Sequence, residues 1–345
     1  ASDPRAKPLV SVVVPARDEA ARIGAAVERL LGQRGVPLEI VVVDDRSQDE
    51  TSAIVRAISE RDPRVRLERV DELPAGWLGK PHACERGARA ARGEWILFTD
   101  GDVLLDSDVL ARALAAARGE GAEHVTITAH LDHANWTANA AICAFGALLL
   151  GHMAAANRDD PKSGVGIGAF NLVRADAWRA IGGHAALAFE VVDDLRLGKL
   201  LRRGGFRTRA YLGRGEVRAV WAADALGVVR ALEKNMFAEL GYDAAKAAVI
   251  TVAFVVVWLG ALAGPFTGTL AGWAAFTGYA LATAVGVVFS ARLRMPVSTA
   301  VASPLFGWVL PAAVANSAWV TLRAGGVSWR GTFYPLAELR ARRVQ

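Results

Sequence analysis

The stretch G-E-W-I-L-F-T-D-G-D, residues 93–102, decides how the rest of the chain is interpreted. Its apolar residues predict a short buried strand, residues 95–99, which leads directly into Asp100 and Asp102. Because Gly101 permits a tight turn, the two carboxylates can converge on one hard cation such as Mg²⁺ or Mn²⁺. A D-G-D tripeptide alone is also a common turn sequence, so the surrounding strands must decide between the two interpretations.

Upstream of this stretch, apolar strands alternate with segments of helical periodicity. Strands are predicted at residues 9–14, 40–43 and 65–70, and helices at residues 19–31, 49–58 and 80–91. This alternation predicts an α/β fold whose mostly parallel sheet is covered on both faces. Ligands of such sheets bind at the carboxyl ends of the strands. At these ends stand Pro15 and the charged residues Arg17, Glu19, Asp44, Asp45, Asp100 and Asp102.

The second predicted strand ends in the run Asp44-Asp45-Arg46-Ser47. A carboxylate at this position can accept hydrogen bonds from a nucleobase or a ribose. The alternative is a structural role in which Ser47 or Asp49 caps the following helix, and both roles can hold together.

Another acidic pair, Asp193 and Asp194, stands much later, after the glycine pair 182–183 and before a predicted amphipathic helix that reaches Arg203. Two carboxylates at close range suit a general base, because each disfavours the charged form of the other. The alternative is that one of them only caps the helix.

The C-terminal third differs in composition from the rest of the chain. Residues 247–291 and 295–322 carry no charged side chain, and each run exceeds the roughly 20 apolar residues that cross a bilayer. The first run is divided at Gly264-Pro265, which predicts two spans, residues 247–263 and 266–290.

The second run contains Pro304 and Pro311. A full third crossing would place the arginine-rich tail opposite the catalytic domain, against the tendency of Lys and Arg to remain cytoplasmic. We therefore expect a re-entrant or broken hairpin at residues 297–322, with position 340 on the catalytic side.

Two shorter apolar segments are expected beside the membrane. Residues 140–151 are too few to span, which favours a buried or interfacial helix. Residues 226–237 form an amphipathic pattern typical of an interfacial helix. The predicted organisation is an α/β domain at 1–225, an interfacial helix at 226–246, transmembrane or re-entrant segments at 247–322 and a basic tail at 323–345. No apolar signal region precedes Val10, which leaves open a membrane segment before residue 1.

Composition argues against several other classes of protein. The net charge of +5 is spread along the chain, which suits an anionic substrate and a membrane surface but not nucleic acid. Cys84 and Cys143 are far apart and predict buried thiols, not a zinc ribbon, redox pair or disulfide framework. His124, His130 and His133 lack companion ligands, which favours core or surface positions. A dinucleotide-binding oxidoreductase would carry G-x-G-x-x-G after the first strand, where residues 15–17 read P-A-R.

Five motifs together resemble family 2 glycosyltransferases of the GT-A fold, with matching order and spacing across residues 9–210. They are P-A-R-D-E (15–19), V-V-V-D-D-R-S-Q-D-E-T (41–51), L-P-A-G-W-L-G-K (73–80), G-E-W-I-L-F-T-D-G-D (93–102) and V-V-D-D-L-R-L-G (191–198). Residues 73–80, E-K-N-M-F-A (233–238) and S-W-R-G-T-F-Y (328–334) are similar to the membrane-attached branch, which acts on carotenoid, hopanoid-associated and ceramide lipids.

The resemblance implies a role for each matching residue. Asp45, with Asp44 beside it, would meet the base and Lys80 the phosphates. A divalent cation would be held by Asp100 and Asp102, with Asp102 the more direct ligand. Asp194 would be the catalytic base, and Asp193 its partner, where the family usually has Glu. The implied donor-binding residues are Pro15, Arg17, Glu19, Asp44, Asp45, Lys80 and Asp100.

The resemblance also implies an activity. It is the inverting transfer of one sugar from a nucleotide-diphosphate sugar, with UDP-glucose the expected donor, to the hydroxyl of a membrane lipid. The enzyme would be a multi-pass membrane protein with its catalytic domain on the cytoplasmic face. Processive synthases of the family carry Q-x-x-R-W, which this sequence lacks. Polysaccharide or polyprenyl-phosphate glycosyl transfer, and a non-catalytic membrane scaffold, are the alternatives; the acids at 45, 100, 102 and 194 argue against the scaffold.

Overall fold

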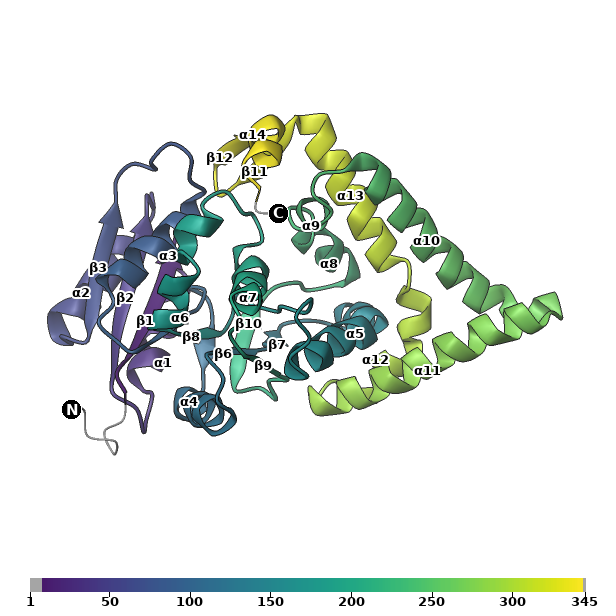
Figure 1. The fold of residues 1–345 in the computed structure, drawn as a ribbon, viewed down its shortest axis with the longest axis horizontal. Helices are drawn as coiled ribbons and strands as arrows, with labels where there is room; N and C mark the ends of the chain where they lie inside the picture. The colour runs from purple at the N-terminus through teal and green to yellow at the C-terminus, as the bar shows by residue number, and fades with distance from the viewer. Residues whose placement is uncertain (1–7, 344–345) are drawn as a thin grey trace. The chain divides into compact units, whose positions relative to one another are not determined.

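The structure is a computed structural model that describes residues 8–343 (Figure 1). The chain divides into two compact units, which are described separately. The sheet unit comprises residues up to 130 together with 153–219, and the helical unit comprises residues 131–152 and 220–343. The predicted boundary at residue 225 lies close to the division between residues 219 and 220. The expectation of a membrane segment before residue 1 lies outside the described residues.

The sheet unit is built on a seven-stranded sheet with the order β3-β2-β1-β4-β8-β6-β9. Strand β8 runs antiparallel to both of its neighbours, and the other pairs are parallel. The prediction of a mostly parallel sheet is therefore confirmed. Its strands are β1 (Val10–Ala16), β2 (Leu38–Asp45), β3 (Val65–Val70), β4 (Trp95–Phe98), β6 (His124–Ile127), β8 (Asn171–Arg174) and β9 (Thr208–Tyr211).

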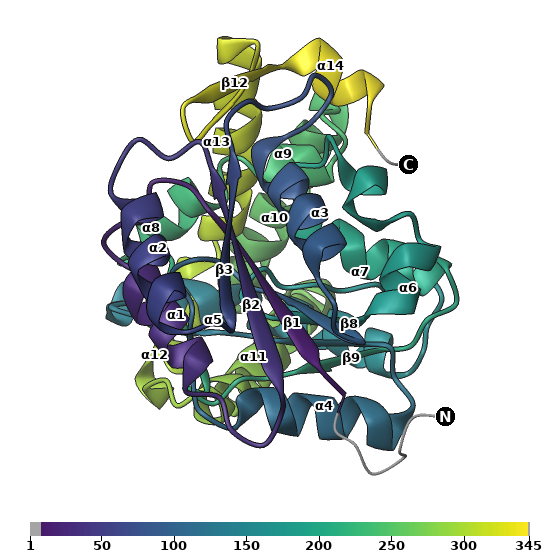
Figure 2. The ribbon, with the colours of Figure 1, turned by 90° about the vertical axis from the view of Figure 1, so that its left-hand side faces the viewer.

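Helices cover both faces of this sheet, as Figure 2 shows for α1 and α2 on one side and α3 and α6 on the other. Successive residues of a strand point to opposite faces, so Val12 and Val14 of β1 join the core beneath α1, whereas Val13 joins the core beneath α3. One core contains α1 (Ile23–Leu31), α2 (Thr51–Arg61) and α4 (Val109–Glu120); the other contains α3 (Gly79–Ala90), α6 (Ala175–Ala180) and α7 (Asp193–Arg203).

One predicted helix starts later than expected. The pattern predicted residues 19–31, but α1 begins at Ile23. The reason is local: the Glu19 N–H donates to Thr51 Oγ1 (2.8 Å), which holds the preceding residues in a turn against the next loop. Smaller elements complete the unit: β5 (Leu104–Leu105) paired antiparallel with β10 (Val217–Val220), and the 3₁₀ helix η1 (Gly183–Leu187).

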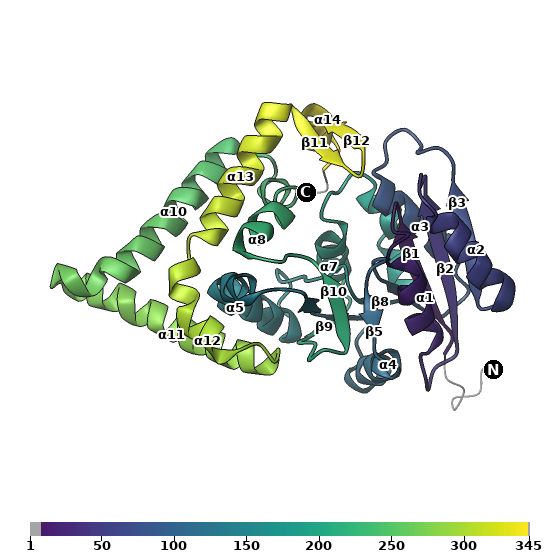
Figure 3. The same ribbon diagram turned by 180° about the vertical axis from the view of Figure 1, so that it is seen from behind.

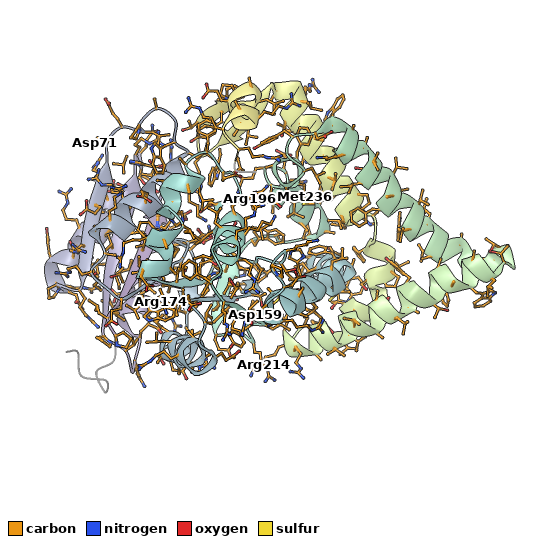
Figure 4. All side chains as sticks on the ribbon, in the orientation of Figure 1. Asp71, Asp159, Arg174, Arg196, Arg214 and Met236 are labelled. Atoms are coloured by element: carbon orange, nitrogen blue, oxygen red, sulfur yellow. The ribbon has the colours of Figure 1, made fainter. Side chains whose placement is uncertain are left out.

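The segment between α5 (Trp136–Asn157) and β8 is held by an arginine cluster around Asp159, which is labelled in Figure 4. Asp159 Oδ1 accepts a hydrogen bond from Arg202 Nη1 (3.0 Å) and another from Arg209 Nη1 (3.0 Å). Arg202 of α7 is buried, and its Nε also donates to the Asp160 carbonyl oxygen (3.0 Å). Because buried charges are stable only when paired, this cluster fixes the start of the segment to α7 and β9.

The helical unit contains the apolar helices of the C-terminal third (Figure 3). The predicted spans correspond to α10 (Ala244–Ala263) and α11 (Leu270–Arg292), and both are long and apolar enough to cross a membrane. The remaining elements are β7 (His130–Asp132), α5 (Trp136–Asn157), α8 (Ala225–Ala231), α9 (Met236–Glu239), η2 (Gly264–Thr267), α12 (Val297–Ala302), η3 (Ser303–Phe306), α13 (Val309–Ala324), β11 (Gly326–Trp329), β12 (Thr332–Pro335) and α14 (Leu336–Ala341), of which β7 and α5 each lie across a boundary between the units.

Two segments of this unit differ from their predicted form. The amphipathic pattern at 226–237 is not one helix, because α8 ends at Ala231 and α9 begins at Met236. The apolar run 140–151 is only the middle of helix α5. The whole helix has 22 residues, which is long enough to cross a membrane. However, β6 precedes α5 and β8 follows it, and the two strands pair in one sheet. Both ends of α5 must therefore lie on one side of a membrane.

The predicted break near Pro304 is present. Helix α13 is bent by 55° relative to the segment Val297–Phe306. The Pro304 carbonyl oxygen, at the break, accepts a hydrogen bond from Trp258 Nε1 (2.8 Å) in addition to one from the Gly307 N–H (3.5 Å). Pro311 lies in the first turn of α13, where a missing N–H has no cost.

Candidate active site

The loops that follow β1 and β2 are joined to each other by reciprocal hydrogen bonds. The Asp18 N–H donates to Ser47 Oγ (2.9 Å), and Asp18 Oδ1 accepts from the Gln48 N–H (2.8 Å). Asp18 and Arg46 both adopt left-handed backbone conformations, with φ of 53° and 60°. Such conformations are uncommon for residues other than glycine and persist only where the surroundings determine them. The two strand ends thus form one rigid edge.

Asp44 supports this edge from inside. It is fully buried, Oδ1 accepts from the Ser47 N–H (3.0 Å), and Oδ2 accepts from the Ser52 hydroxyl. Asp49 holds the same turn, since its carboxylate accepts from the Thr51 N–H (3.0 Å). Neither Ser47 nor Asp49, the two predicted caps, is the N-cap residue of α2. The N-cap is Glu50, and its side chain makes no capping hydrogen bond.

Asp45 lies beside two arginines at the end of β2. Arg46 donates to it through Nε (2.8 Å to Oδ1) and Nη2 (3.0 Å to Oδ2), and Arg17 Nη1 lies 3.9 Å from Oδ2. A Cβ at Gly79 would collide with Asp45 Oδ2, so α3 can begin this close to β2 only with glycine. Two guanidinium groups therefore lie against one carboxylate at the end of β2.

Lys80, in the first turn of α3, meets the D-G-D residues across a pocket. Its Nζ lies 2.5 Å from Asp100 Oδ1, and the pocket is also lined by Pro15, Asp193 and Asp194. Burial would lower the pKa of Lys80, but Asp100, Asp193 and Asp194 outweigh it and hold the pKa well above its ordinary value. The structure therefore brings together at one point residues that are more than 110 positions apart in the sequence.

Asp102 belongs to a second acidic cluster beside Asp100. Burial, Asp100 and Glu19 together raise the pKa of Asp102 to about 6, and Arg22 opposes them only weakly, with Nη1 4.0 Å from Oδ2. Burial contributes most to this shift, and the two neighbouring carboxylates add to it. The carboxylate oxygens of Asp100 and Asp102 are the kind of donor that suits a hard divalent cation.

Asp194 is held by backbone donors at the start of α7. Its Oδ2 accepts from the Gly168 N–H (2.7 Å), and its Oδ1 accepts from the Leu195 N–H (2.8 Å). The alternative that this pair only caps the helix is not what the structure shows: the N-cap is Val192, and Asp193 and Asp194 lie in the first turn. Asp193 is buried, whereas Asp194 is partly exposed.

A second group of possible metal ligands lies against the pocket. Cys84, His184 and Asp193 each place one ligand atom within 4.8 Å of the others. The Trp178 Nε1–H donates to His184 Nδ1 (3.1 Å), so in the neutral ring the proton is on Nε2. Burial lowers the pKa of His184 to about 3, which keeps the ring neutral. With one nitrogen accepting and the other protonated, His184 offers a metal no lone pair.

Both cysteines are free and buried, as predicted, and His124 is a core histidine. His124 Nε2 lies 3.1 Å from Asn171 Oδ1 and Nδ1 lies 3.1 Å from Thr208 Oγ1, and burial lowers the pKa of His124 to about 4. The three glycines of G-V-G-I-G, residues 164–168, were missed. Their spacing at alternate positions directly before a strand was the signal that could have identified them. Gly168 contacts Asp194 of the acidic pair.

Comparison with known proteins shows which family the chain resembles. Residues 6–241 match the family described as glycosyltransferase like family 2. The succinoglycan biosynthesis protein ExoO of Rhizobium meliloti is 43% identical over 116 residues, which are 34% of this chain and 32% of that protein. A 4,4'-diaponeurosporenoate glycosyltransferase of Staphylococcus aureus is 34% identical over 94 residues, 27% of this chain and 24% of that protein. The chain thus matches a third or less of the length of these relatives.

A solved structure shares the fold over most of the chain. The mannosyltransferase PcManGT of Pyrobaculum calidifontis, determined with GDP-Man and Mn²⁺, aligns with a TM-score of 0.56 and 21% identity, covering 92% of this chain and 89% of that one. The α/β fold is therefore of the GT-A type, as predicted. Because the family match covers more than half of its residues, the chain belongs to glycosyltransferase-like family 2.

Proposed function

We propose that this protein is an inverting glycosyltransferase that transfers a single sugar from a nucleotide-diphosphate sugar to the hydroxyl of a membrane lipid. The observation that carries the proposal is the convergence of Lys80, Asp100 and Asp194 in one pocket at the carboxyl edge of the sheet. One cation for a diphosphate, one acidic cluster for a metal and one carboxylate for a base are the groups this reaction needs.

The nucleotide would occupy the edge formed by the loops after β1 and β2. Pro15, Arg17, Glu19 and Asp45 line or support this edge, and Asp44 holds its turn from within. Lys80 and Asp100 would approach the diphosphate. The charged ammonium of Lys80 suits phosphate oxygens, which have no proton to donate at neutral pH.

The divalent cation, Mg²⁺ or Mn²⁺, would be held by Asp100 and Asp102, with Asp102 the more direct ligand. Asp100 and Glu19 add to the effect of burial in raising the pKa of Asp102, and a cation bound here would offset their repulsion. Such a cation, when bound, neutralises the charge of a departing diphosphate. The Mn²⁺ and GDP-Man named with the mannosyltransferase structure agree with this choice of ligand class.

Asp194 would be the base that takes the proton from the acceptor hydroxyl. Two backbone N–H groups orient its carboxylate, and both oxygens keep further lone pairs for a hydroxyl. Attack of that hydroxyl at the anomeric carbon, on the face opposite the leaving diphosphate, inverts the configuration. Asp193, buried next to it, would help to set the local charge.

The acceptor would come from the membrane. Within residues 8–343, α10 and α11 are long and apolar enough to cross a bilayer, and one relative is named a 4,4'-diaponeurosporenoate glycosyltransferase. The alternative is polysaccharide synthesis, which the name of the succinoglycan relative favours. UDP-glucose remains the expected donor, and GDP-mannose is the second sugar nucleotide to test.

The test uses purified full-length protein in detergent, a panel of sugar nucleotides, Mg²⁺ or Mn²⁺, and lipid extract or polysaccharide primers. We expect release of nucleoside diphosphate that requires both metal and lipid. Asp194→Asn should reduce this release by about 100-fold or more, whereas Asp108→Asn, whose side chain is 62% exposed, should not. Release with the primers alone would establish the alternative acceptor. Binding of donor without release under any condition would make the protein a scaffold and refute the proposal.

A further inference from the structure

The face of α7 that carries Asp194 is defined by three residues spaced four apart: Asp194, Gly198 and Arg202. Residues at this spacing lie above one another on one side of a helix. Asp194 lies in the first turn, and Arg202 is near the far end, where its Nε holds the Asp160 carbonyl oxygen. The segment from Asp160 to Gly168 therefore runs along this face toward the first turn of the helix.

Glycine stands at each point where this segment approaches α7 most closely. A Cβ on Gly164 would collide with the Lys199 backbone, and a Cβ on Gly166 would collide with the Asp194 backbone. From the helix side, a Cβ on Gly198 would collide with the Val165 backbone. Backbone atoms cannot rotate out of the way as a side chain can, so this contact requires glycine on both partners.

Gly168 ends the segment at the reactive groups. Its N–H donates to Asp194 Oδ2 (2.7 Å), and a Cβ on it would lie 3.0 Å from Asp100 Oδ2, 3.1 Å from Asp194 Oδ2 and 3.4 Å from Lys80 Nζ. Its φ is not in the left-handed region, so alanine is compatible with the backbone conformation. The requirement for glycine here is one of space, between the proposed metal ligand, the proposed base and the phosphate-binding lysine.

We propose that the segment Ser163–Gly168 is a positioning element for Asp194 and that Gly168 is its decisive residue. The Gly168 amide fixes one carboxylate oxygen, and the missing side chain leaves that oxygen in place, because a Cβ would press against it at 3.1 Å. This inference rests on the proposed function, since it assigns Asp194 as the base. Gly168 itself takes no part in bond making or proton transfer.

Gly168→Ala tests the proposal, with Gly119→Ala as the matched control. Gly119 lies in α4 of the same unit, and a Cβ there has nothing within 4 Å. We expect Gly168→Ala to lower kcat by about 10- to 100-fold, the size of effect that a displacement of less than 1 Å has on aligned reacting groups. The affinity for nucleoside diphosphate with Mn²⁺ should change by less than about threefold, and the melting temperature should match that of Gly119→Ala.

A double-mutant cycle separates positioning of the base from other effects. If Gly168 acts through Asp194, Gly168→Ala should cost much less activity in an Asp194→Asn background than in the wild type. The same loss in both backgrounds, or full activity of Gly168→Ala, would overturn the inference while leaving the proposed function intact. Full activity of Asp194→Asn alone would instead refute the proposed base. A large loss of Mn²⁺-nucleotide affinity in Gly168→Ala would place its action on Asp100 and also overturn the inference.

Discussion

Lys80 approaches Asp100 with Nζ 2.5 Å from Oδ1, and its pKa is held well above the ordinary value by Asp100, Asp193 and Asp194 against the effect of burial. The side chain is therefore an ammonium group throughout the neutral range. Removing it with Lys80→Met should weaken binding of nucleoside diphosphate by about 10- to 100-fold, since one charge-assisted contact to phosphate is lost. Isothermal titration calorimetry measures this directly. Lys246→Met, at a side chain 66% exposed, is the control and should bind normally; equal affinity of both variants would remove Lys80 from the phosphate site.

His124 gives the sheet unit a predictable response to acid. Its folded pKa of about 4 lies below the ordinary value of 6.5, so the unfolded chain binds a proton that the folded chain does not. Stability from this group is complete above about pH 6.5 and falls as the pH decreases toward 4, by about 3 kcal/mol in total. In His124→Gln this part of the pH dependence should disappear, which denaturant unfolding between pH 4 and 7 measures. An unchanged slope in the variant would contradict the assignment.

At the residue scale, sequence alone predicts charged groups better than backbone donors. Asp100, Asp194 and Lys80 belong to recognisable motifs, and the structure brings them into one pocket. The amide of Gly168 could not be predicted, because the direction of an N–H depends on how the segment 163–168 lies against α7. The bonds of Asp44 to its own turn also depend on loop geometry that periodicity does not describe.

At the element scale, the break between α12 and α13 depends on Gly307. A Cβ on Gly307 would collide with the ring of Trp258 and the hydroxyl of Tyr279, and Trp258 donates to the Pro304 carbonyl oxygen at the break. Gly307→Ala should therefore destabilise the helical unit by about 1–3 kcal/mol, the range for overpacking. Thermal unfolding in detergent measures the change.

The control for Gly307→Ala is Gly278→Ala in α11. A Cβ there has nothing within 4 Å, so alanine should be neutral or slightly stabilising through its higher helix propensity. Equal melting temperatures of the two variants would show that the contacts at the break do not constrain α10 and α11.

The elements that sequence predicts best are those with long, uniform patterns. Strands β1 to β4 and helices α10 and α11 fall where apolar runs place them, because burial alone selects them. The break at residues 232–235 was not predictable, since E-K-N-M-F-A keeps helical periodicity. It is set by tertiary hydrogen bonds: the Phe237 N–H donates to Ser317 Oγ (2.9 Å), and the Glu233 carboxylate accepts from Asn316 Nδ2 (2.8 Å).

On the scale of the whole molecule, contacts within the helical unit constrain the membrane topology. Lys234 and Tyr242 precede α10, whereas Trp329 and Arg340 follow α13. The Lys234 Nζ lies 4.5 Å from the centre of a Trp329 ring, and Arg340 Nη2 donates to the Tyr242 carbonyl oxygen (2.7 Å). Residues in contact outside the bilayer lie on one side of it, so an even number of crossings separates them. We propose that α10 and α11 are the two crossings, which would make the bent pair α12 and α13 re-entrant.

Cysteine labelling tests this topology. A cysteine introduced as Arg340→Cys should be inaccessible to a membrane-impermeant reagent in intact cells and become labelled after permeabilisation. Phe266→Cys, at the turn between α10 and α11 where the side chain is 90% exposed, should label from outside. The two native cysteines are buried and should give little background. Labelling of position 340 only from outside would show that the bent pair crosses completely.

The anomeric configuration of the glycolipid product tests whether the sugar is transferred with inversion. A single base at Asp194 requires direct displacement at the anomeric carbon, which inverts the configuration. The product formed from an α-linked sugar nucleotide by the purified enzyme can be assigned by proton NMR from the coupling of its anomeric hydrogen. We predict a β-glycoside with no detectable α-anomer. An α-glycoside would show that Asp194 does not act as the single base of a direct displacement.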